Sequence, residues 1–213
     1  MPDFELENLC SGTVVGVDEA GRGPWAGPVT AGAVIFKNRE LPEDLAKGLD
    51  DSKKLSPQKR EKMYLRLREE EAKGNLCIGI GWADCREIDE LNILQATYLA
   101  MKRAVDALPL PADAALVDGN RAPNNFACPV QTVIKGDGKS YSIAAASIAA
   151  KVCRDRLMAE LGQKYPQYGF AQNAGYGTAE HIAALEKFGV TPEHRRSYKP
   201  VQKILLQKNK KIA

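Results

Sequence analysis

The sequence of 213 residues lacks any apolar run near the length of about 20 residues that a membrane-spanning helix needs. Its opening segment, Met1–Glu7, is acidic and lacks the basic-then-apolar order of a secretory signal. The apolar fraction of 44% and the charged fraction of 27% are ordinary for a globular domain. We therefore expect a cytoplasmic protein that does not associate with membranes.

Cysteine, histidine and tryptophan are scarce. The five cysteines are odd in number and include no Cys-x-x-Cys pair, which argues against a disulfide framework and a zinc site. The two histidines, His181 and His194, follow none of the acid-ended strands described below, so a structural role is favoured over that of a general base. Trp25 and Trp82 are expected in the core.

An excess of one charge is also missing, because the formal net charge is only +3. The charge is nevertheless uneven along the chain. After Glu186, a single acid, Glu193, is accompanied by eight basic residues: Lys187, Arg195, Arg196, Lys199, Lys203, Lys208, Lys210 and Lys211. Two interpretations stay open, namely a surface for phosphate backbones and a solvated terminal segment.

The apolar pattern predicts an α/β fold, with a mixed β-sheet flanked by helices. Strands are expected at residues 13–17, 29–36, 76–83, 114–117 and 130–134. Helices are expected at residues 58–72, 88–108, 140–161, 178–188 and 200–208, with residues 40–56 irregular. We expect one catalytic domain over residues 1–162, followed by a helical C-terminal extension over residues 163–213 that contributes to substrate binding.

Acidic residues follow three of the predicted strands. Asp18 and Glu19 come after the first strand, Asp118 after the fourth and Asp137 after the fifth. One such acid alone is usually part of a turn, but ligand sites gather at strand ends in open α/β sheets. Four clustered carboxylates would raise one another's pKa, and divalent cations remove that penalty. The pattern predicts two cations roughly 3.5–4 Å apart, which together promote in-line phosphoryl displacement.

A short loop with two glycines follows the first pair of acids. Gly21 and Gly23 allow the backbone to approach a ligand closely, because they have no side chain. Arg22 between them suits phosphate, since a guanidinium makes planar, charge-assisted hydrogen bonds. Carboxylates for metal beside such a loop indicate metal-assisted phosphodiester chemistry.

Two glycine patterns that are similar to nucleotide-binding motifs do not satisfy them. Gly21–Ala26 leads into Pro28 and a strand, whereas a dinucleotide-binding fingerprint requires a helix at that point. Gly138–Ser140 matches the end of a P-loop, but Val133 stands where the first glycine belongs. A phosphotransferase with a related sheet therefore lacks its nucleotide-binding loop here.

Seven ordered motifs resemble those of bacterial ribonuclease HII, the type 2 ribonuclease H family. They occupy residues 18–23, 51–55, 88–96, 117–120, 135–137 with 142–151, 175–178 and 194–197. The resemblance extends from Val14 to about Val201, and the seven motifs together are far more specific than any one of them. Type 1 enzymes lack the opening motif at residues 18–23, and type 3 enzymes carry an additional N-terminal domain.

The resemblance implies an RNase H-like fold and a metal-dependent endonuclease. Such an enzyme hydrolyses the RNA strand of RNA–DNA hybrids and nicks DNA 5′ of a single embedded ribonucleotide, leaving 3′-hydroxyl and 5′-phosphate ends. By this resemblance Asp18, Glu19, Asp118 and Asp137 are the ligands of Mg²⁺ or Mn²⁺, in agreement with the reasoning from strand ends. The implied partners are RNA–DNA hybrids and DNA duplexes with embedded ribonucleotides.

The resemblance also implies which residues recognise the sugar. The backbone of Gly21, Arg22 and Gly23 is expected to contact the 2′-hydroxyl, which distinguishes RNA from DNA. Tyr176 is expected to assist and to stack on the next sugar. The residue after this tyrosine is Gly177, where relatives often have proline, so the loop is expected to be more flexible.

Further residues are predicted to contact the phosphate backbone. Lys53 is expected near the scissile phosphate, and Arg195 and Arg196 are expected either to contact the nucleic acid or to support the acids. Hydroxyl groups after Asp137 could hold phosphates, although a helix-packing role fits Ser147 equally well. These hydroxyls belong to Ser140, Ser142 and Ser147.

Two questions about partners stay open at this stage. A nucleic-acid-binding module that used the basic C-terminal end alone would not need four acids at strand ends, which repel DNA in the absence of metal. The segment Gln202–Leu206 could dock a sliding clamp, but a terminal helix that packs on the domain is the preferred interpretation. A monomer is the default expectation.

Overall fold

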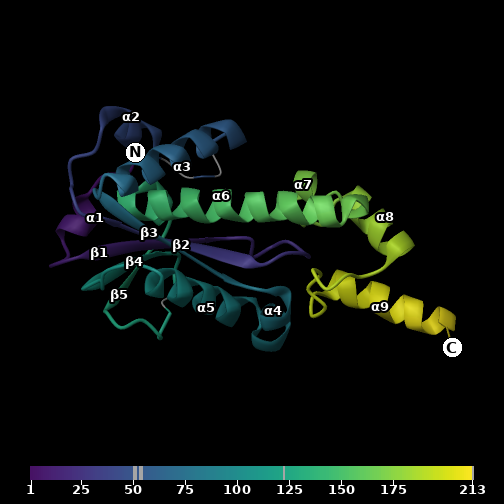
Figure 1. The fold of residues 1–213 in the computed structure, drawn as a ribbon. Helices are drawn as coiled ribbons and strands as arrows, with labels where there is room; N and C mark the ends of the chain where they lie inside the picture. The colour runs from purple at the N-terminus through teal and green to yellow at the C-terminus, as the bar shows by residue number, and fades with distance from the viewer. Residues whose placement is uncertain (50–51, 53–54, 122, 213) are drawn as a thin grey trace.

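A single five-stranded mixed sheet forms the centre of the computed structural model, which describes residues 1–49, 52, 55–121 and 123–212. The strands are β1 (Val14–Ala20), β2 (Val29–Phe36), β3 (Leu76–Ala83), β4 (Ala114–Asp118) and β5 (Val130–Val133). Their order is β3-β2-β1-β4-β5. Antiparallel pairs join β3, β2 and β1, whereas β1, β4 and β5 are parallel (Figure 1).

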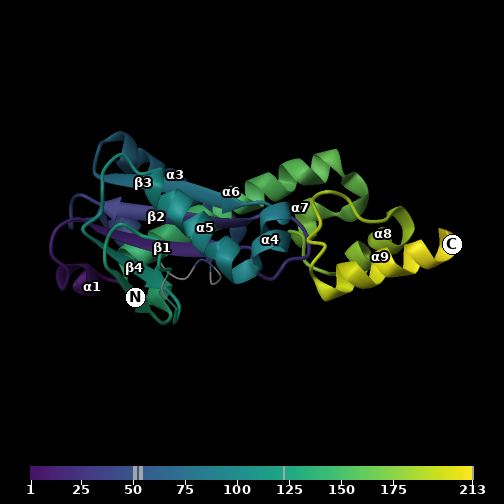
Figure 2. The same cartoon turned by 90° about the horizontal axis from the view of Figure 1, so that it is seen from below.

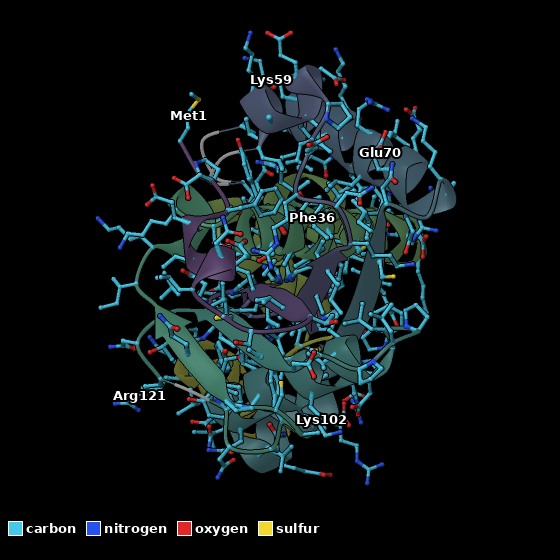
Figure 3. All side chains as sticks on the ribbon, turned by 90° about the vertical axis from the view of Figure 1, so that its left-hand side faces the viewer. Met1, Phe36, Lys59, Glu70, Lys102 and Arg121 are labelled. Carbon is cyan, nitrogen blue, oxygen red and sulfur yellow. The ribbon has the colours of Figure 1, made fainter. Side chains whose placement is uncertain are left out.

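Helices cover both faces of this sheet. The helices among the described residues are α1 (Glu5–Asn8), α2 (Glu43–Gly48), α3 (Pro57–Ala72), α4 (Cys85–Leu91), α5 (Ile93–Asp106), α6 (Tyr141–Lys164), α7 (Phe170–Asn173), α8 (Ala179–Phe188) and α9 (Lys199–Ile212), with 3-10 helices η1 (Gly136–Gly138) and η2 (Pro166–Tyr168). Helix α6 crosses one face and α5 covers the other (Figures 1 and 2). In the end-on view Lys59 and Glu70 mark α3 above α6, while Lys102 marks α5 on the opposite side (Figure 3).

Alternation along β1 determines which side chains face which helix. Val15 and Val17 are fully buried in the cluster that contains α5 residues, so the intervening positions face α6. Gly16 is one of these positions, and a Cβ there would lie 2.2 Å from the backbone of Ser142 in α6. The first turns of α6 can therefore rest directly on β1, beside the acids that end the strand.

The C-terminal helices pack around a separate apolar cluster beyond one end of the sheet (Figures 1 and 2). Met158 of α6, Phe170 of α7 and Leu185 of α8 are buried in it, together with Ala26 from the loop after β1. Helix α6 thus spans both parts of the molecule, and the predicted boundary at residue 162 falls inside it. None of the helices among the described residues is long and apolar enough to cross a membrane.

Several predictions from the sequence are confirmed at residue precision. The strands at 29–36 and 76–83 have the expected bounds. The polar residues Ser56 and Thr178, at the predicted starts of two helices, each accept a hydrogen bond from the backbone three residues later and so cap these helices. Ser140, placed inside a helix by the sequence, is likewise a cap.

Three expectations are wrong. Residues 88–108 form two helices, because Asn92 has φ of 69° and its side chain caps α5. Residues 40–56, expected to be irregular, contain α2. Trp82, expected in the core, is 55% exposed, because β3 is an edge strand and Trp82 lies near its end.

Candidate active site

The carboxyl ends of β1 and β4 lie side by side at one edge of the sheet. Val17 pairs with Val117, so Asp18 and Asp118 occupy the next matching positions on the two parallel strands. Since Val17 and Val117 both belong to the cluster on the α5 face, Asp18 and Asp118 point to the α6 face. Glu19, the next residue of β1, lies on the α5 side. Three of the four predicted acids therefore meet where these strands end.

Asp18 is buried and surrounded by negative charge. It is 4% exposed, its Oδ1 accepts the backbone N–H of Glu19 at 2.7 Å, and its side chain is hydrogen-bonded to Ser147 of α6. Burial raises the pKa of the Asp18 carboxyl well above its ordinary value, and the charges of Glu19 and Asp118 raise it further. Such a site favours a bound cation, because a cation would allow all three groups to be ionised.

Asp137 reaches the same edge through the turn that follows β5. The backbone N–H of Gly136 donates to Asp118 Oδ1 at 2.7 Å, which fastens this turn to the end of β4. Asp137 is the next residue, lies in η1 and is 7% exposed. The sheet thus brings all four predicted acids to one edge, with Asp137 adjoining the atoms that contact Asp118.

Divalent cations of the Mg²⁺ type fit the chemistry of this edge. All four candidate ligands are carboxylates, and hard cations take oxygen ligands, whereas zinc and copper sites commonly include nitrogen or sulfur. Within the part of the chain that the structure describes, no three acidic, cysteine or histidine side chains are arranged as a finished set of metal ligands. The structure therefore provides the donor atoms and their strand-end placement.

A cavity of about 400 Å³ opens on the α5 side of this edge. Glu19, Arg22 and Asp118 line it together with Asn120 and Arg121 from the loop after β4, and side chains of α5 complete its wall. Arg22 Nη1 lies 3.3 Å from Glu19 Oε1. The cavity therefore combines acidic groups at the strand ends with two guanidinium groups that suit phosphate oxygens.

The loop after β1 is in contact with Tyr176. A Cβ on Gly23 would be 3.4 Å from Tyr176 Cε1, so the aromatic ring adjoins this glycine. Half of the tyrosine, 51%, remains exposed. Gly21 has φ of 94°, and a Cβ there would lie 1.9 Å from Nε of Arg154. The residues predicted to recognise a sugar therefore come together, with backbone groups and an accessible aromatic face side by side.

Two buried arginines hold this loop by its carbonyl groups. Arg195 is fully buried, and its guanidinium donates to the carbonyls of Gly21 at 2.5 Å and Arg22 at 2.8 Å. Arg154 of α6, 1% exposed, donates to the carbonyl of Ala174 at 3.0 Å and to carbonyls at the other end of the loop. Burial, followed by the charge of Arg195, lowers the pKa of Arg154 to about 10.

Arg195 and Arg196, for which the sequence predicted the same role, differ in their location in the structure. Arg195 lies under the loop and not on the surface, so it supports the loop from below, whereas Arg196 is exposed. The backbone N–H of Arg196 donates to the carboxylate of Asp89 in α4 at 2.8 Å. Lys53 lies outside the described residues. The sequence did not predict a role for Arg154, because its hydrogen-bond partners are backbone carbonyls that are remote in sequence.

The serines after Asp137 do not serve as phosphate ligands. Ser140 and Ser142 are buried, and their hydroxyls donate to the buried carboxylate of Glu7 in α1, both at 2.7 Å. Ser147 is buried as well, beside Asp18 and 2.9 Å from the hydroxyl of Ser52. The expectation that Ser140 and Ser142 hold phosphates is therefore wrong, because both face the interior of the protein. For Ser147 the alternative of a helix-packing role is confirmed.

Comparison with known proteins agrees with this geometry. A mixed five-stranded sheet flanked by helices, with acids at the strand ends, defines the RNase H-like class of fold. The family model described as ribonuclease HII matches residues 15–201, and the chain belongs to this family. It is accordingly a type 2 ribonuclease H, with ribonuclease H activity on RNA–DNA hybrids.

The similarity extends over nearly the whole chain. A ribonuclease HII from Jannaschia sp. (strain CCS1) is 52% identical over 204 residues, which cover 96% of this chain and 98% of the relative. The crystal structure of ribonuclease H2 from Pyrococcus horikoshii OT3 is 29% identical, with a TM-score of 0.78 and coverage of 93% and 100%. An RNase HII from Archaeoglobus fulgidus, solved as a PCNA complex, is 25% identical, with a TM-score of 0.72 and coverage of 88% and 96%.

Proposed function

We propose that this enzyme uses Mg²⁺ or Mn²⁺ to nick DNA on the 5′ side of a single embedded ribonucleotide, as well as to cut longer RNA–DNA hybrids. One observation carries the proposal. The half-exposed ring of Tyr176 lies against Gly23, on the loop that directly follows Asp18 and Glu19. A surface able to recognise one sugar therefore adjoins the carboxylates that would act on the neighbouring phosphate.

The carboxylates of Asp18, Glu19, Asp118 and Asp137 would hold the cations. Bound cations lower the pKa of a water ligand and stabilise the charge of the leaving oxygen. The residues of the chain orient the phosphate so that water adds to phosphorus in line with the bond to O3′. That bond breaks and O3′ takes a proton, which yields a 3′-hydroxyl and a 5′-phosphate.

Backbone groups suit the recognition of a ribose. The 2′-hydroxyl is both a donor and an acceptor, and it is small enough to be reached by glycine backbone without interference from a side chain. Arg195 holds the carbonyls of Gly21 and Arg22 from below, so the free groups of this loop are oriented before substrate binds. The Tyr176 ring would pack on the sugar of the following nucleotide.

Three matched duplexes test the proposal. One is all DNA, one contains a single ribonucleotide, and one is a full RNA–DNA hybrid, each incubated with Mg²⁺ or with chelator and resolved on a sequencing gel. We expect cleavage of the second and third duplexes only with Mg²⁺, and the cut in the second immediately 5′ of the ribonucleotide. Cleavage of the all-DNA duplex, or cleavage in chelator, would contradict it.

The same proposal includes the setting in which the enzyme works. We place it in the cytoplasm as a monomer, and the five free cysteines support a reducing compartment.

Helix α9 buries Val201 and Ile204 against the body but leaves Leu206 63% exposed. Because the relative from Archaeoglobus fulgidus forms a complex with PCNA, α9 is our candidate for docking a sliding clamp. Loss of clamp binding on Leu206→Ala is the expected result.

A further inference from the structure

The two histidines of the chain face each other in the C-terminal core. Their Nε2 atoms are 3.0 Å apart, and His181 and His194 are 0% and 1% exposed. The rings of Tyr168 and Phe170 pack around both, with centroid distances from 5.1 to 6.2 Å. Two buried imidazoles in contact require a defined arrangement of protons, since two N–H groups cannot point at each other.

The neighbouring backbone groups determine that arrangement. The backbone N–H of Thr191 donates to His194 Nδ1 at 3.0 Å, so this nitrogen is an acceptor and the proton of His194 is on Nε2. His181 Nδ1 lies 2.9 Å from the carbonyl oxygen of Tyr176, which can only accept, so the proton of His181 is on Nδ1. The Thr191 hydroxyl, 2.8 Å from the same His194 Nδ1, accepts the N–H of Glu193 and can donate to this nitrogen as well. One neutral tautomer of each ring therefore agrees with these contacts.

These tautomers form a directed chain of hydrogen bonds. The N–H of Thr191 donates to His194, His194 Nε2–H donates to His181 Nε2, and His181 Nδ1–H donates to the carbonyl of Tyr176. Burial lowers the pKa of both imidazoles, that of His194 to about 4, which preserves this neutral arrangement near pH 7. The chain ends on the backbone of the residue whose ring adjoins the substrate loop.

The hydrogen bond from His181 to the Tyr176 carbonyl helps to determine where the Tyr176 ring lies. The Tyr176 ring is half exposed, so packing alone does not hold it, and its position follows from its backbone. The N–H of Tyr176 donates to Asn173 at 2.9 Å on one side, and the preceding carbonyl, that of Gly175, accepts from Trp25 at 2.8 Å. The Tyr176 carbonyl itself accepts the backbone N–H of Thr178 at 2.9 Å, and His181 provides its side-chain contact.

We propose that His181 and His194 are positioning residues, whose hydrogen-bonded relay holds Tyr176 in the orientation that distinguishes a single ribonucleotide from a continuous hybrid. This inference rests on the proposed function of Tyr176. Neither histidine contacts the substrate. Their effect is on the choice between substrates, because a displaced Tyr176 ring would lose its contact with the sugar while the carboxylates remain in place.

The tautomers can be measured directly and without activity. Long-range ¹H–¹⁵N correlation spectra at pH 7 of untagged protein show which nitrogen of each ring carries the proton, and the chain has only two histidines to assign. We expect His181 protonated on Nδ1 and His194 on Nε2. The opposite assignment for either ring, or a doubly protonated ring, would overturn the relay.

The functional consequence is tested by the ratio of two cleavage rates, at a single ribonucleotide and within a full hybrid. His181→Phe keeps a ring of similar size but removes both hydrogen bonds, and we expect the ratio to fall about tenfold. His181→Asn keeps a donor near the Nδ1 position, and we expect it to retain most of the wild-type ratio. A His181→Phe enzyme with the wild-type ratio would contradict the inference.

Two controls separate this inference from the proposed function. If wild type does not nick the single-ribonucleotide duplex, or if Tyr176→Ala keeps the wild-type ratio, the proposed function fails. If both behave as proposed and His181→Phe does not change the ratio, only the relay fails.

Should His181→Phe not fold, His181→Gln replaces it, because glutamine reaches the Nε2 position but lacks a donor at Nδ1. A His181→Gln ratio equal to that of His181→Asn would then overturn the relay.

Discussion

Gly21 has no room for a side chain, for two independent reasons. Its φ of 94° disfavours any residue with a Cβ, and that atom would lie 1.9 Å from Arg154 Nε. We expect Gly21→Ala to lower the free energy of unfolding by about 2–4 kcal/mol and to reduce cleavage sharply, since Arg154 would have to move. Urea denaturation and a single-turnover cleavage assay measure the two effects.

Gly74 provides a matched control for that substitution. Its φ is 82°, yet no atom lies within 4 Å of a Cβ built there. Gly74→Ala should therefore show only the backbone strain, about 1 kcal/mol, with normal cleavage. Equal destabilisation by both substitutions would show that Arg154 does not restrict the loop.

Arg154 and Arg195 share a property that explains their place in the site. Their guanidinium groups donate to backbone carbonyls and a tyrosine hydroxyl, and to no carboxylate of the described residues. Among these residues, no hydrogen-bonded acid neutralises their positive charges. They lie under a loop that would bind a polyanion, where that charge is favourable.

Asn92 separates α4 from α5, and α5 forms one wall of the cavity that Glu19 and Asp118 line. Its side chain accepts hydrogen bonds from the backbone of Leu94 at 3.0 Å and Gln95 at 3.2 Å, and its φ is 69°. Asn92→Ala loses the cap and retains the strained φ, so we expect a loss of about 1–2 kcal/mol. Asn92→Gly relieves the strain and should cost less. Thermal denaturation compares the two, and a larger loss for glycine would contradict this account.

Local patterns in the sequence predicted most elements correctly. The apolar pattern predicted β2, β3 and most of the helices, because this signal depends on neighbours within a few residues. The start of α4 had a local signal too, since Asp84 and Glu87 form a capping box there. The apolar spacing, continuous across residues 88–108, obscured it.

The site was predictable only in part. The acids at the ends of β1 and β4 are visible in the sequence, but their adjacency follows from the strand order, which a single sequence does not reveal. The role of Arg195 could not be derived, because its partners are carbonyls of residues 168 to 174 positions away. Carbonyls occur at every residue, so no side-chain pattern identifies such contacts.

The stability of the whole molecule should depend on pH through the histidine pair. Burial, and then the charge of His181, lowers the pKa of His194 from 6.5 to about 4, while the pKa in the unfolded chain stays near 6.5. The unfolded state therefore binds a proton first as pH falls, and folded stability decreases between pH 6.5 and pH 4 by up to about 3 kcal/mol. Asp18 acts in the opposite direction, because its raised pKa favours the folded state at low pH.

A difference measurement isolates the histidine contribution. Wild type and His194→Asn are unfolded in urea at pH 7.5, 5.5 and 4.5, and the difference between their free energies of unfolding is followed. We expect wild type to lose stability relative to the variant as pH falls, since asparagine does not titrate. A difference that is constant over this range would contradict the depressed pKa.

The basic C-terminal end should act on binding through long-range charge. Lys199 and Lys203 are exposed on α9, and each phosphate contact adds a slope of about 0.9 to the dependence of log kcat/KM on log salt concentration. We expect the double substitution Lys199→Ala and Lys203→Ala to reduce this slope by up to about 2. Lys62→Ala, on the exposed side of α3, is the control. Equal slopes in all three proteins would assign the basic end to a solvated segment.

The claim that Asp18, Glu19, Asp118 and Asp137 form one cation-dependent centre is tested most directly by the single-turnover rate of nicking at one ribonucleotide in Mg²⁺. We predict that Asp118→Asn reduces this rate at least about 100-fold with the fold retained in a thermal melt. Glu160→Gln, an exposed acid on α6 far along the helix from Ser147, should keep the wild-type rate. An Asp118→Asn enzyme that nicks as fast as the Glu160→Gln control would contradict the account.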